Sequence, residues 1–158
     1  MEYIAHKDGE RKQSVKEHLQ STAKLSGYFA SKFGKEEWGY CCGMLHDIGK
    51  YSKEFQRKIQ EDTNESVDHS TAGAKLCKEL GGYYSILSYC IAGHHAGLPD
   101  YGNTVISSSL CGRCNKKICD FSRYKEEIEI PELYTEPITY DRSKNLDFSL
   151  STFIRMLY

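Results

Sequence analysis

Apolar residues recur at helical spacing along the first hundred residues of the chain. Between 13 and 33 they include Val15, Leu19, Ala23 and Ala30, which lie four or seven residues apart and so share one face of a helix. Similar patterns predict further helices over 35–48, from an N-cap at Ser52 through Ile59, over 69–80 after an N-cap at Asp68, and over 83–95. The stretch 83–95 is apolar on most sides, which is typical of a central, buried helix. The pattern therefore predicts an all-α fold.

The pattern is weaker in the rest of the chain. All three prolines lie after residue 98, and all thirteen glycines lie at or before Gly112. We expect a turn-rich loop over 97–103, a helix over 105–127, extended or irregular chain over 128–140, and a last helix that starts near Ser149. Apolar residues still recur in that helix where the sequence reaches Tyr158, so we expect the last helix to be truncated. The 158 residues are enough for one domain, with its motifs in about 3–102 and a less regular part over 103–158.

Composition and charge exclude several classes of protein. Lys and Arg number 21 against 22 Asp and Glu, so net charge alone cannot drive binding to a polyanion. No apolar run approaches the roughly 18 residues of a membrane helix, and no signal peptide pattern is present. The seven cysteines are an odd number and include the adjacent pair Cys41 and Cys42, which does not suit a secreted disulfide framework. We expect a soluble protein of the reducing cytoplasm with no membrane partner.

The six histidines all precede residue 96, and most lie at predicted helix ends. The places that matter are the following: His18 on the first helix, the pair His46-Asp47 at the end of the second, His69 at the start of a later one, and His94-His95 at the end of the buried helix. Side chains from separate helix ends can converge on one point. Taken singly, each place could instead hold a hydrogen-bonded core histidine or an ion pair. Together they predict a metal centre.

The predicted ligands define the chemistry that the centre could perform. Imidazole is the commonest side-chain metal ligand, and a carboxylate can bridge two ions. Two ions roughly 3.5–4 Å apart can hold a shared hydroxide and clamp a phosphodiester for in-line attack. Nitrogen and oxygen ligands suit Fe, Mn, Ni, Co or Zn, with Mg also possible, and the sequence does not choose among them. We therefore expect up to two divalent metal ions as cofactors.

Three other features carry less weight. Cys111, Cys114 and Cys119 form a C-x2-C-x4-C run without the fourth ligand of a structural zinc site, so we expect reduced, partly buried thiols. His6 falls in a segment that reads as loose, and we assign it no role. Small basic clusters, such as Lys7 with Arg11 and Lys12, could steer a nucleic-acid strand locally, but we favour a solvated surface for each of them.

Several runs of residues resemble a known family. Leu45-His46-Asp47-Ile48-Gly49-Lys50 resembles the signature of HD-domain metal-dependent phosphohydrolases. Asp68-His69-Ser70-Thr71-Ala72-Gly73-Ala74 and Ala92-Gly93-His94-His95-Ala96-Gly97-Leu98-Pro99-Asp100 are similar to the CRISPR-associated HD nuclease, which is the nuclease part of the type I helicase–nuclease. Tyr3-Ile4-Ala5-His6 and Ser14-Val15-Lys16-Glu17-His18-Leu19 resemble its opening. The resemblance covers roughly residues 3–102 in order and spacing.

The resemblance implies an HD-domain helical bundle and a set of ligand roles. One metal would be held by His18, His46 and Asp47, and the second by His69, His94 and His95 with Asp47 as the bridge. Lys50 would stabilise charge on the phosphate, and we favour this role over the alternative of a cation at a helix C-terminus. Ser70 would position phosphate or metal-bound water, unless it is an ordinary serine of a first helical turn.

The chain departs from the family pattern in one respect. The family completes its first metal site with an aspartate on a late helix, in a Ser-x-Leu-Val-Asp-Ala-Asp-like run. Here the last helix reaches Tyr158 where that run should begin, and Asp141 and Asp147 are expected before the helix, so no residue is assigned. We expect a weaker first site, in a chain that is a fragment or part of a split protein.

The resemblance also implies a function. It is cleavage of single-stranded DNA by two-metal hydroxide attack, in CRISPR antiviral defence. The partners would be a helicase segment, fused or in trans, and an RNA-guided surveillance complex. Two alternatives remain open. One is an HD phosphohydrolase of small nucleotides, and the other is a catalytically impaired fragment that serves as a docking module because the last aspartate is absent.

Overall fold

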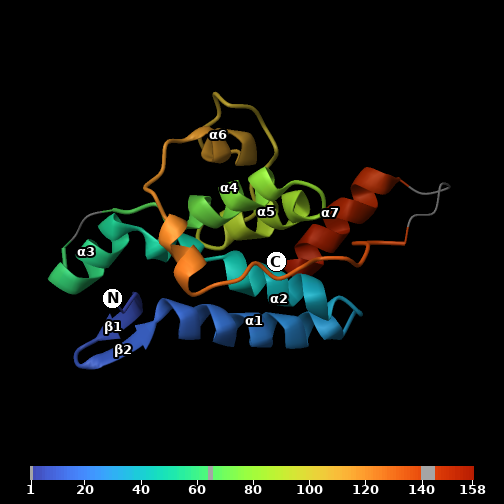
Figure 1. Cartoon of the computed structure of the whole chain (residues 1–158). Helices are drawn as coiled ribbons and strands as arrows, with labels where there is room; N and C mark the ends of the chain where they lie inside the picture. The colour runs from blue at the N-terminus through green and yellow to red at the C-terminus, as the bar shows by residue number, and fades with distance from the viewer. Residues whose placement is uncertain (1, 64–65, 140–144) are drawn as a thin grey trace.

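Helices dominate the structure, a computed structural model that describes residues 2–63, 66–139 and 145–158 (Figure 1). The chain begins with an antiparallel hairpin of β1 (Ile4–Asp8) and β2 (Arg11–Ser14). The helices follow in the order α1 (Val15–Ser31), α2 (Glu36–Leu45), η1 (Ile48–Tyr51), α3 (Lys53–Glu61), α4 (Ser70–Leu80), α5 (Tyr84–Gly93), α6 (Leu110–Asn115), η2 (Ser122–Glu126) and α7 (Leu146–Leu157), where η marks a 3-10 helix. The predicted all-α class is confirmed, with one small sheet added.

The helix starts follow local capping chemistry. Ser52 Oγ accepts a hydrogen bond from the Phe55 amide at 3.3 Å, and α3 begins at the next residue, as predicted. Asp68 Oδ1 accepts from the Thr71 amide at 3.1 Å, at the first turn of α4. The second helix ends earlier than the predicted 48, because α2 stops at Leu45 and the tighter η1 starts at Ile48. This break places a short turn where the sequence suggested a continuous helix.

The core forms where α4 and α5 cross over α1 and α2 (Figure 1). Leu19, Leu45, Leu87 and Ile91 are fully buried in it, which confirms the central position predicted for 83–95. Trp38 is also fully buried, and its indole N–H donates to the Thr135 carbonyl at 3.0 Å. The Trp38 ring meets Phe153 of α7 edge-on at 4.9 Å between centroids. The irregular segment before α7 and α7 itself therefore cover α2 and hold it against α5.

The predicted helix over 105–127 is wrong. The structure has only the short α6 and η2 there, separated by loops. Asn103 Oδ1 accepts from the amides of Val105 and Ile106, and Ser109 Oγ accepts from the Gly112 amide. Short polar side chains that bond to nearby backbone amides offer the chain an alternative to a continuous helix.

The last helix also starts earlier than predicted. Asn145 Oδ1 accepts from the Phe148 amide at 3.0 Å, so α7 begins at Leu146 instead of near Ser149. Asp147 consequently lies in the first turn of α7, whereas we expected it before the helix. Asp141, the other aspartate considered for the missing ligand, lies outside the described residues.

The N-terminal segment is an ordered hairpin, so the prediction that it is loose is wrong. Asp8 pairs with Arg11 across a two-residue turn whose first position is Gly9 at φ +57°, a backbone angle that glycine adopts without strain. The Gln56 side chain donates to the Ile4 carbonyl at 3.0 Å and accepts from the Ile4 amide at 2.8 Å. These two bonds fix β1 against α3.

Two further findings concern the membrane and the thiols. Within the described ranges, no helix combines the length and apolarity that a membrane crossing requires. All seven cysteines are free thiols. Cys111, Cys114 and Cys119 are half-buried, in agreement with the sequence-based interpretation, and no cysteine joins a candidate ligand group among the described residues.

Candidate metal centre

The break between α2 and η1 places Asp47 at the meeting point of four other chain segments. Asp47 is 3% exposed, and its peptide carbonyl accepts from the Lys50 amide at 2.9 Å, which closes the first turn of η1. The imidazoles around it come from α1, the end of α2, the residue before α4 and the residues after α5; they belong to His18, His46, His69, His94 and His95. The structure thus brings together all six residues that the sequence suggested as ligands.

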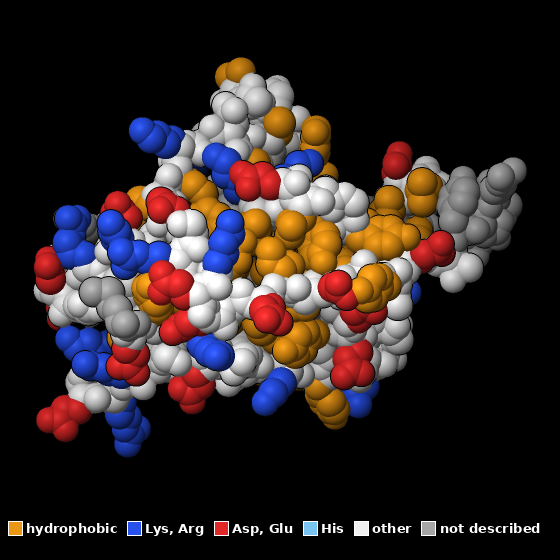
Figure 2. Space-filling view, in the orientation of Figure 1, with side chains coloured by type: hydrophobic (Ala, Val, Ile, Leu, Met, Phe, Trp, Pro, Cys, Tyr) orange, Lys and Arg blue, Asp and Glu red, His pale blue; other side chains and the backbone are white. Residues whose placement is uncertain are grey.

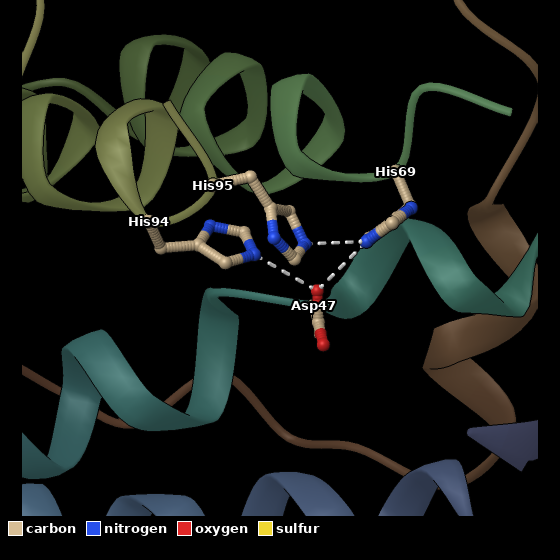
Figure 3. Close-up of side chains that lie close together, drawn as sticks. All are labelled: Asp47, His69, His94 and His95. Carbon is tan, nitrogen blue, oxygen red and sulfur yellow. Dashed lines mark hydrogen bonds and ion pairs between the residues drawn. The ribbon is translucent and has the colours of Figure 1, made fainter. Parts of the chain in front are cut away.

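One oxygen of Asp47 faces the histidines that directly precede α4 and directly follow α5 (Figure 3). Asp47 Oδ1 lies 3.1 Å from His94 Nε2 and 3.4 Å from His69 Nε2. His69 Nε2 lies 2.9 Å from His95 Nε2. The donor atoms of these four residues all fall within 4.8 Å of one another, which is compatible with a shared cation.

The other oxygen of the same carboxylate faces a second set. Asp47 Oδ2 lies 3.0 Å from His18 Nε2 and 3.3 Å from His46 Nε2, and the two imidazole nitrogens are 3.2 Å apart. The two sets share only Asp47 and use different oxygens of it. This is the arrangement that a bridging carboxylate would have between two neighbouring ions.

The backbone determines which ring nitrogens face the centre. His46 Nδ1 lies 2.7 Å from the Gly43 carbonyl, and His94 Nδ1 lies 2.7 Å from the Ile91 carbonyl. A carbonyl oxygen can only accept, so both Nδ1 atoms carry the proton, and in the neutral ring Nε2 then presents a lone pair. His69 Nδ1 is placed similarly, 3.2 Å from the Val67 carbonyl. Such backbone partners orient metal-binding imidazoles and fix their tautomer.

This tautomer shows that the residues fit a divalent cation. Lone pairs on nitrogens 2.9–3.4 Å from one another and from carboxylate oxygens repel unless a positive charge lies between them. Without metal that charge is supplied by extra protons, and metal binding displaces them. Burial lowers the pKa of His69 and of His95, which favours the unprotonated form that binds metal. Fe, Mn, Ni, Co and Zn all suit these donors.

The charge of Asp47 is compensated on several sides. Burial alone would raise the pKa of its carboxyl, but in the metal-free protein hydrogen bonds from His18, His46 and His94, which need a proton on Nε2, outweigh burial and hold the pKa far below the usual range. The Lys50 ammonium lies 2.8 Å from Asp47 Oδ2 and is itself almost fully buried. Asp47 is therefore ionised, and Lys50 reaches the centre through this carboxylate.

The remaining candidate residues occupy less direct positions. Ser70 Oγ donates to Asp68 Oδ1 at 3.4 Å, and a role for it with phosphate stays a prediction. His6, to which the sequence reasoning gave no role, has its Nε2 3.3 Å from Lys50 Nζ and its ring against His18. The missed signal was Gly9-Glu10, because glycine at the first position of a two-residue turn is typical of a β-hairpin, and this hairpin places β1 next to α1.

The C-terminal part adds no ligand to either set within the described residues. Asp147 instead lines a cavity of about 380 Å³ between α5 and α7, together with Tyr101 and Leu150. The set around Asp47 Oδ2 therefore has three ligand residues, and the set around Oδ1 has four. A weaker first site stays a prediction.

Substituting Gly49 with Ala should destabilise the protein and disturb the centre. A Cβ at Gly49 would lie 2.3 Å from the His69 carbonyl oxygen and 2.7 Å from Ala72 Cβ, so η1 and α4 would have to separate. Overpacking of this kind costs about 1–3 kcal/mol of unfolding free energy, measurable by urea denaturation. Gly27→Ala is the matched control, because its nearest neighbour would be 3.3 Å away. Equal stability of the two variants would contradict the close contact of η1 with α4.

Comparison with known proteins agrees with this geometry. The family model of the HD domain matches residues 15–139, which is most of the chain. The chain belongs to the HD domain family. Over an alignment of 126 residues, the chain is also 28% identical to Ribonuclease Y of Mycoplasma pneumoniae (strain ATCC 29342 / M129 / Subtype 1), with 74% of this chain and 23% of that relative covered. The chain thus spans less than a quarter of the length of the curated relative that it matches.

HD domains bind divalent metals, and the shared Asp47 with its five histidines is a matching donor set. Family and geometry together indicate a metal-dependent hydrolase of phosphate esters. The match to the HD domain covers the helices from α1 through η2 and the segment that follows η2. The hairpin, which carries His6 beside the centre, lies outside it.

Proposed function

We propose that this chain is a metal-dependent nuclease that cuts single-stranded DNA in CRISPR antiviral defence, together with a helicase segment and an RNA-guided surveillance complex. The observation that carries the nuclease proposal is Asp47, whose two oxygens face two separate histidine sets. The choice of DNA and of CRISPR rests on the resemblance of the runs around His69 and His94-His95 to the CRISPR-associated HD nuclease.

The two ligand sets, Asp47 and His95 would have different roles in hydrolysis. Divalent ions held by the two sets would polarise the phosphodiester and lower the pKa of a water molecule that attacks it. Asp47 would fix the spacing of the two sets and balance their charge. His95 is exposed while Asp47 is buried, so the substrate would approach from the side of His95.

RNA is a second candidate substrate, because the chain is similar to a protein named Ribonuclease Y. The chemistry at the centre would be the same, since the phosphodiester is common to both nucleic acids. Recognition of the sugar and the path of the strand would differ. The small-nucleotide phosphohydrolase and the impaired docking module remain the other possible results of the test.

The test is cleavage by the purified chain after chelation and reloading with one metal at a time. Substrates are a single-stranded DNA, an RNA of the same sequence, a DNA duplex, a cyclic dinucleotide and a nucleoside triphosphate, with His46→Ala and Asp47→Ala as controls. We expect metal-dependent cleavage of single-stranded DNA that both substitutions lower strongly. Faster cleavage of RNA or of the small nucleotides would replace the proposed substrate. Absence of both bound metal and cleavage would leave the docking role.

A further inference from the structure

A cavity of about 460 Å³ opens beside the metal centre, between the hairpin and α3. We call it the hairpin pocket, and the lining residues that matter are Lys7, Phe55, Lys58, Ile59 and Thr63. Figure 2 shows basic side chains, with acidic ones among them, at the end of the molecule that carries the hairpin and α3. Neither the match to the HD domain nor the ligand sets assign a role to this cavity.

The hairpin pocket shares a wall with the metal centre. The Phe55 ring meets the His69 ring edge-on at 5.2 Å between centroids, and Lys50 Nζ lies 5.6 Å from the Phe55 centroid. A chain of phosphodiesters held at the centre would therefore have its next unit within reach of this cavity.

The charges of the hairpin pocket suit a phosphate group. The described residues of the lining include two positive side chains, Lys7 and Lys58, and one negative side chain, Asp62. Lys7 also pairs directly with Lys12 across the hairpin, and like charges at such a position destabilise a two-stranded sheet. No ion pair within the described residues compensates these three ammonium groups. The negative charges of a bound polyanion would compensate these ammonium groups.

The walls of the hairpin pocket suit the rest of a nucleotide. Phe55 and Ile59 provide an apolar surface between the two lysines, and aromatic surfaces stack on nucleobases of any sequence. Thr63 Oγ1 is buried and has no hydrogen-bond partner among the described residues, so a ligand could supply the missing bond. Apolar surface, two ammonium groups and a hydroxyl that lack partners among the described residues together match a nucleotide unit.

A larger cavity does not have these properties. It measures about 710 Å³ and lies between the first two helices and residues 125–132, and no metal ligand lines it. Four glutamates line it against Lys16 and Lys125; they are Glu126, Glu127, Glu129 and Glu132. Its net negative charge would repel a phosphate backbone. The larger cavity is therefore unsuited to a nucleic-acid strand, whereas the positive charge of the hairpin pocket suits one.

We propose that the hairpin pocket binds the nucleotide next to the phosphodiester that is cut, with Lys7 and Lys58 contacting phosphates of the single strand. This inference rests on the proposed nuclease function and adds to it a path for the strand. Lys12, opposite Lys7, extends the positive surface in the direction away from the centre.

The test measures binding of a short, fluorescently labelled oligothymidylate by anisotropy, in chelator, at several salt concentrations. Each phosphate contact that a lysine makes to a single strand contributes about 0.7 to the slope of log K against log salt. We expect the double variant Lys7→Gln/Lys58→Gln to lose about 1.4 of this slope. Lys24→Gln, which changes an exposed lysine of α1, is the matched control and should keep the slope of the unmodified protein.

A second measurement separates this inference from the proposed function. With metal present, the double variant should lose roughly tenfold more kcat/KM for the oligonucleotide than for bis(p-nitrophenyl) phosphate, which is too small to occupy both sites. An unchanged slope, or a strand that does not bind at all, would overturn the hairpin pocket. A reduced slope in a protein that cleaves nothing would support the pocket and overturn the nuclease.

Discussion

Replacing Asp47 with Asn should remove metal from both ligand sets and lower phosphodiester hydrolysis by at least about 10³-fold. Asp47 is the residue that the two sets share, and its two oxygens each face different histidines. The amide of Asn is neutral and has one oxygen, so it cannot serve two cations. No neighbouring carboxylate among the described residues stands in the centre to replace it.

The measurement is metal content after dialysis, by elemental analysis, alongside the rate of hydrolysis. His46→Ala should remove only the set around Oδ2, so this variant should retain metal at the set around Oδ1. Asp8→Asn, which changes an exposed aspartate of the hairpin, is the matched control and should bind metal normally. Normal metal content in Asp47→Asn would show that the histidines bind without the carboxylate and would contradict the bridging role.

A folding control belongs to this experiment, because Asp47 also pairs with the buried Lys50 at 2.8 Å. Losing one partner of a buried ion pair costs about 3–5 kcal/mol. Circular dichroism and urea denaturation of the variant therefore have to show a folded chain before a loss of activity is assigned to the metal. The His46→Ala variant keeps the Asp47–Lys50 pair and is the better-folded comparison.

The helices that bring the ligands together could be predicted from the sequence, because their apolar faces are regular. Val15, Leu19, Leu87 and Ile91 are all buried as their spacing indicates. The break after Leu45 could not be read in this way, since an apolar stripe does not distinguish α2 followed by η1 from one longer helix. That break is nevertheless what turns Asp47 toward both histidine sets.

The parts that the sequence misplaced are governed by local polar bonds. Asn103 and Asn145 bond to amides two or three residues later, and these bonds decide where the chain bends and where α7 begins. The hairpin was missed because β1 and β2 lack an alternating apolar pattern, although Gly9 marks the first position of their turn. The candidate ligands could be chosen from residue type and position. The contact between Lys50 and His6 could be found only in the folded structure.

Lys50→Met should destabilise the metal-free protein by about 3 kcal/mol, and divalent metal should restore most of this loss. Methionine keeps the length of the buried side chain but removes the ammonium that lies 2.8 Å from Asp47 Oδ2, so the carboxylate loses its permanent positive partner. Divalent cations would bind the same carboxylate in the folded state only, and binding to the folded state alone raises stability. The measurement is urea denaturation in chelator and with saturating metal.

Lys53→Met is the matched control, because Lys53 is exposed on the first turn of α3, and its stability should change by less than about 0.5 kcal/mol with or without metal. An equal loss for Lys50→Met in both conditions would show that Lys50 and the metal do not act on the same charge. The same variant also tests the predicted contact of Lys50 with the phosphate. If the metal-loaded variant is stable but kcat remains low, Lys50 acts on the substrate; if kcat recovers together with stability, Lys50 serves to hold and balance Asp47.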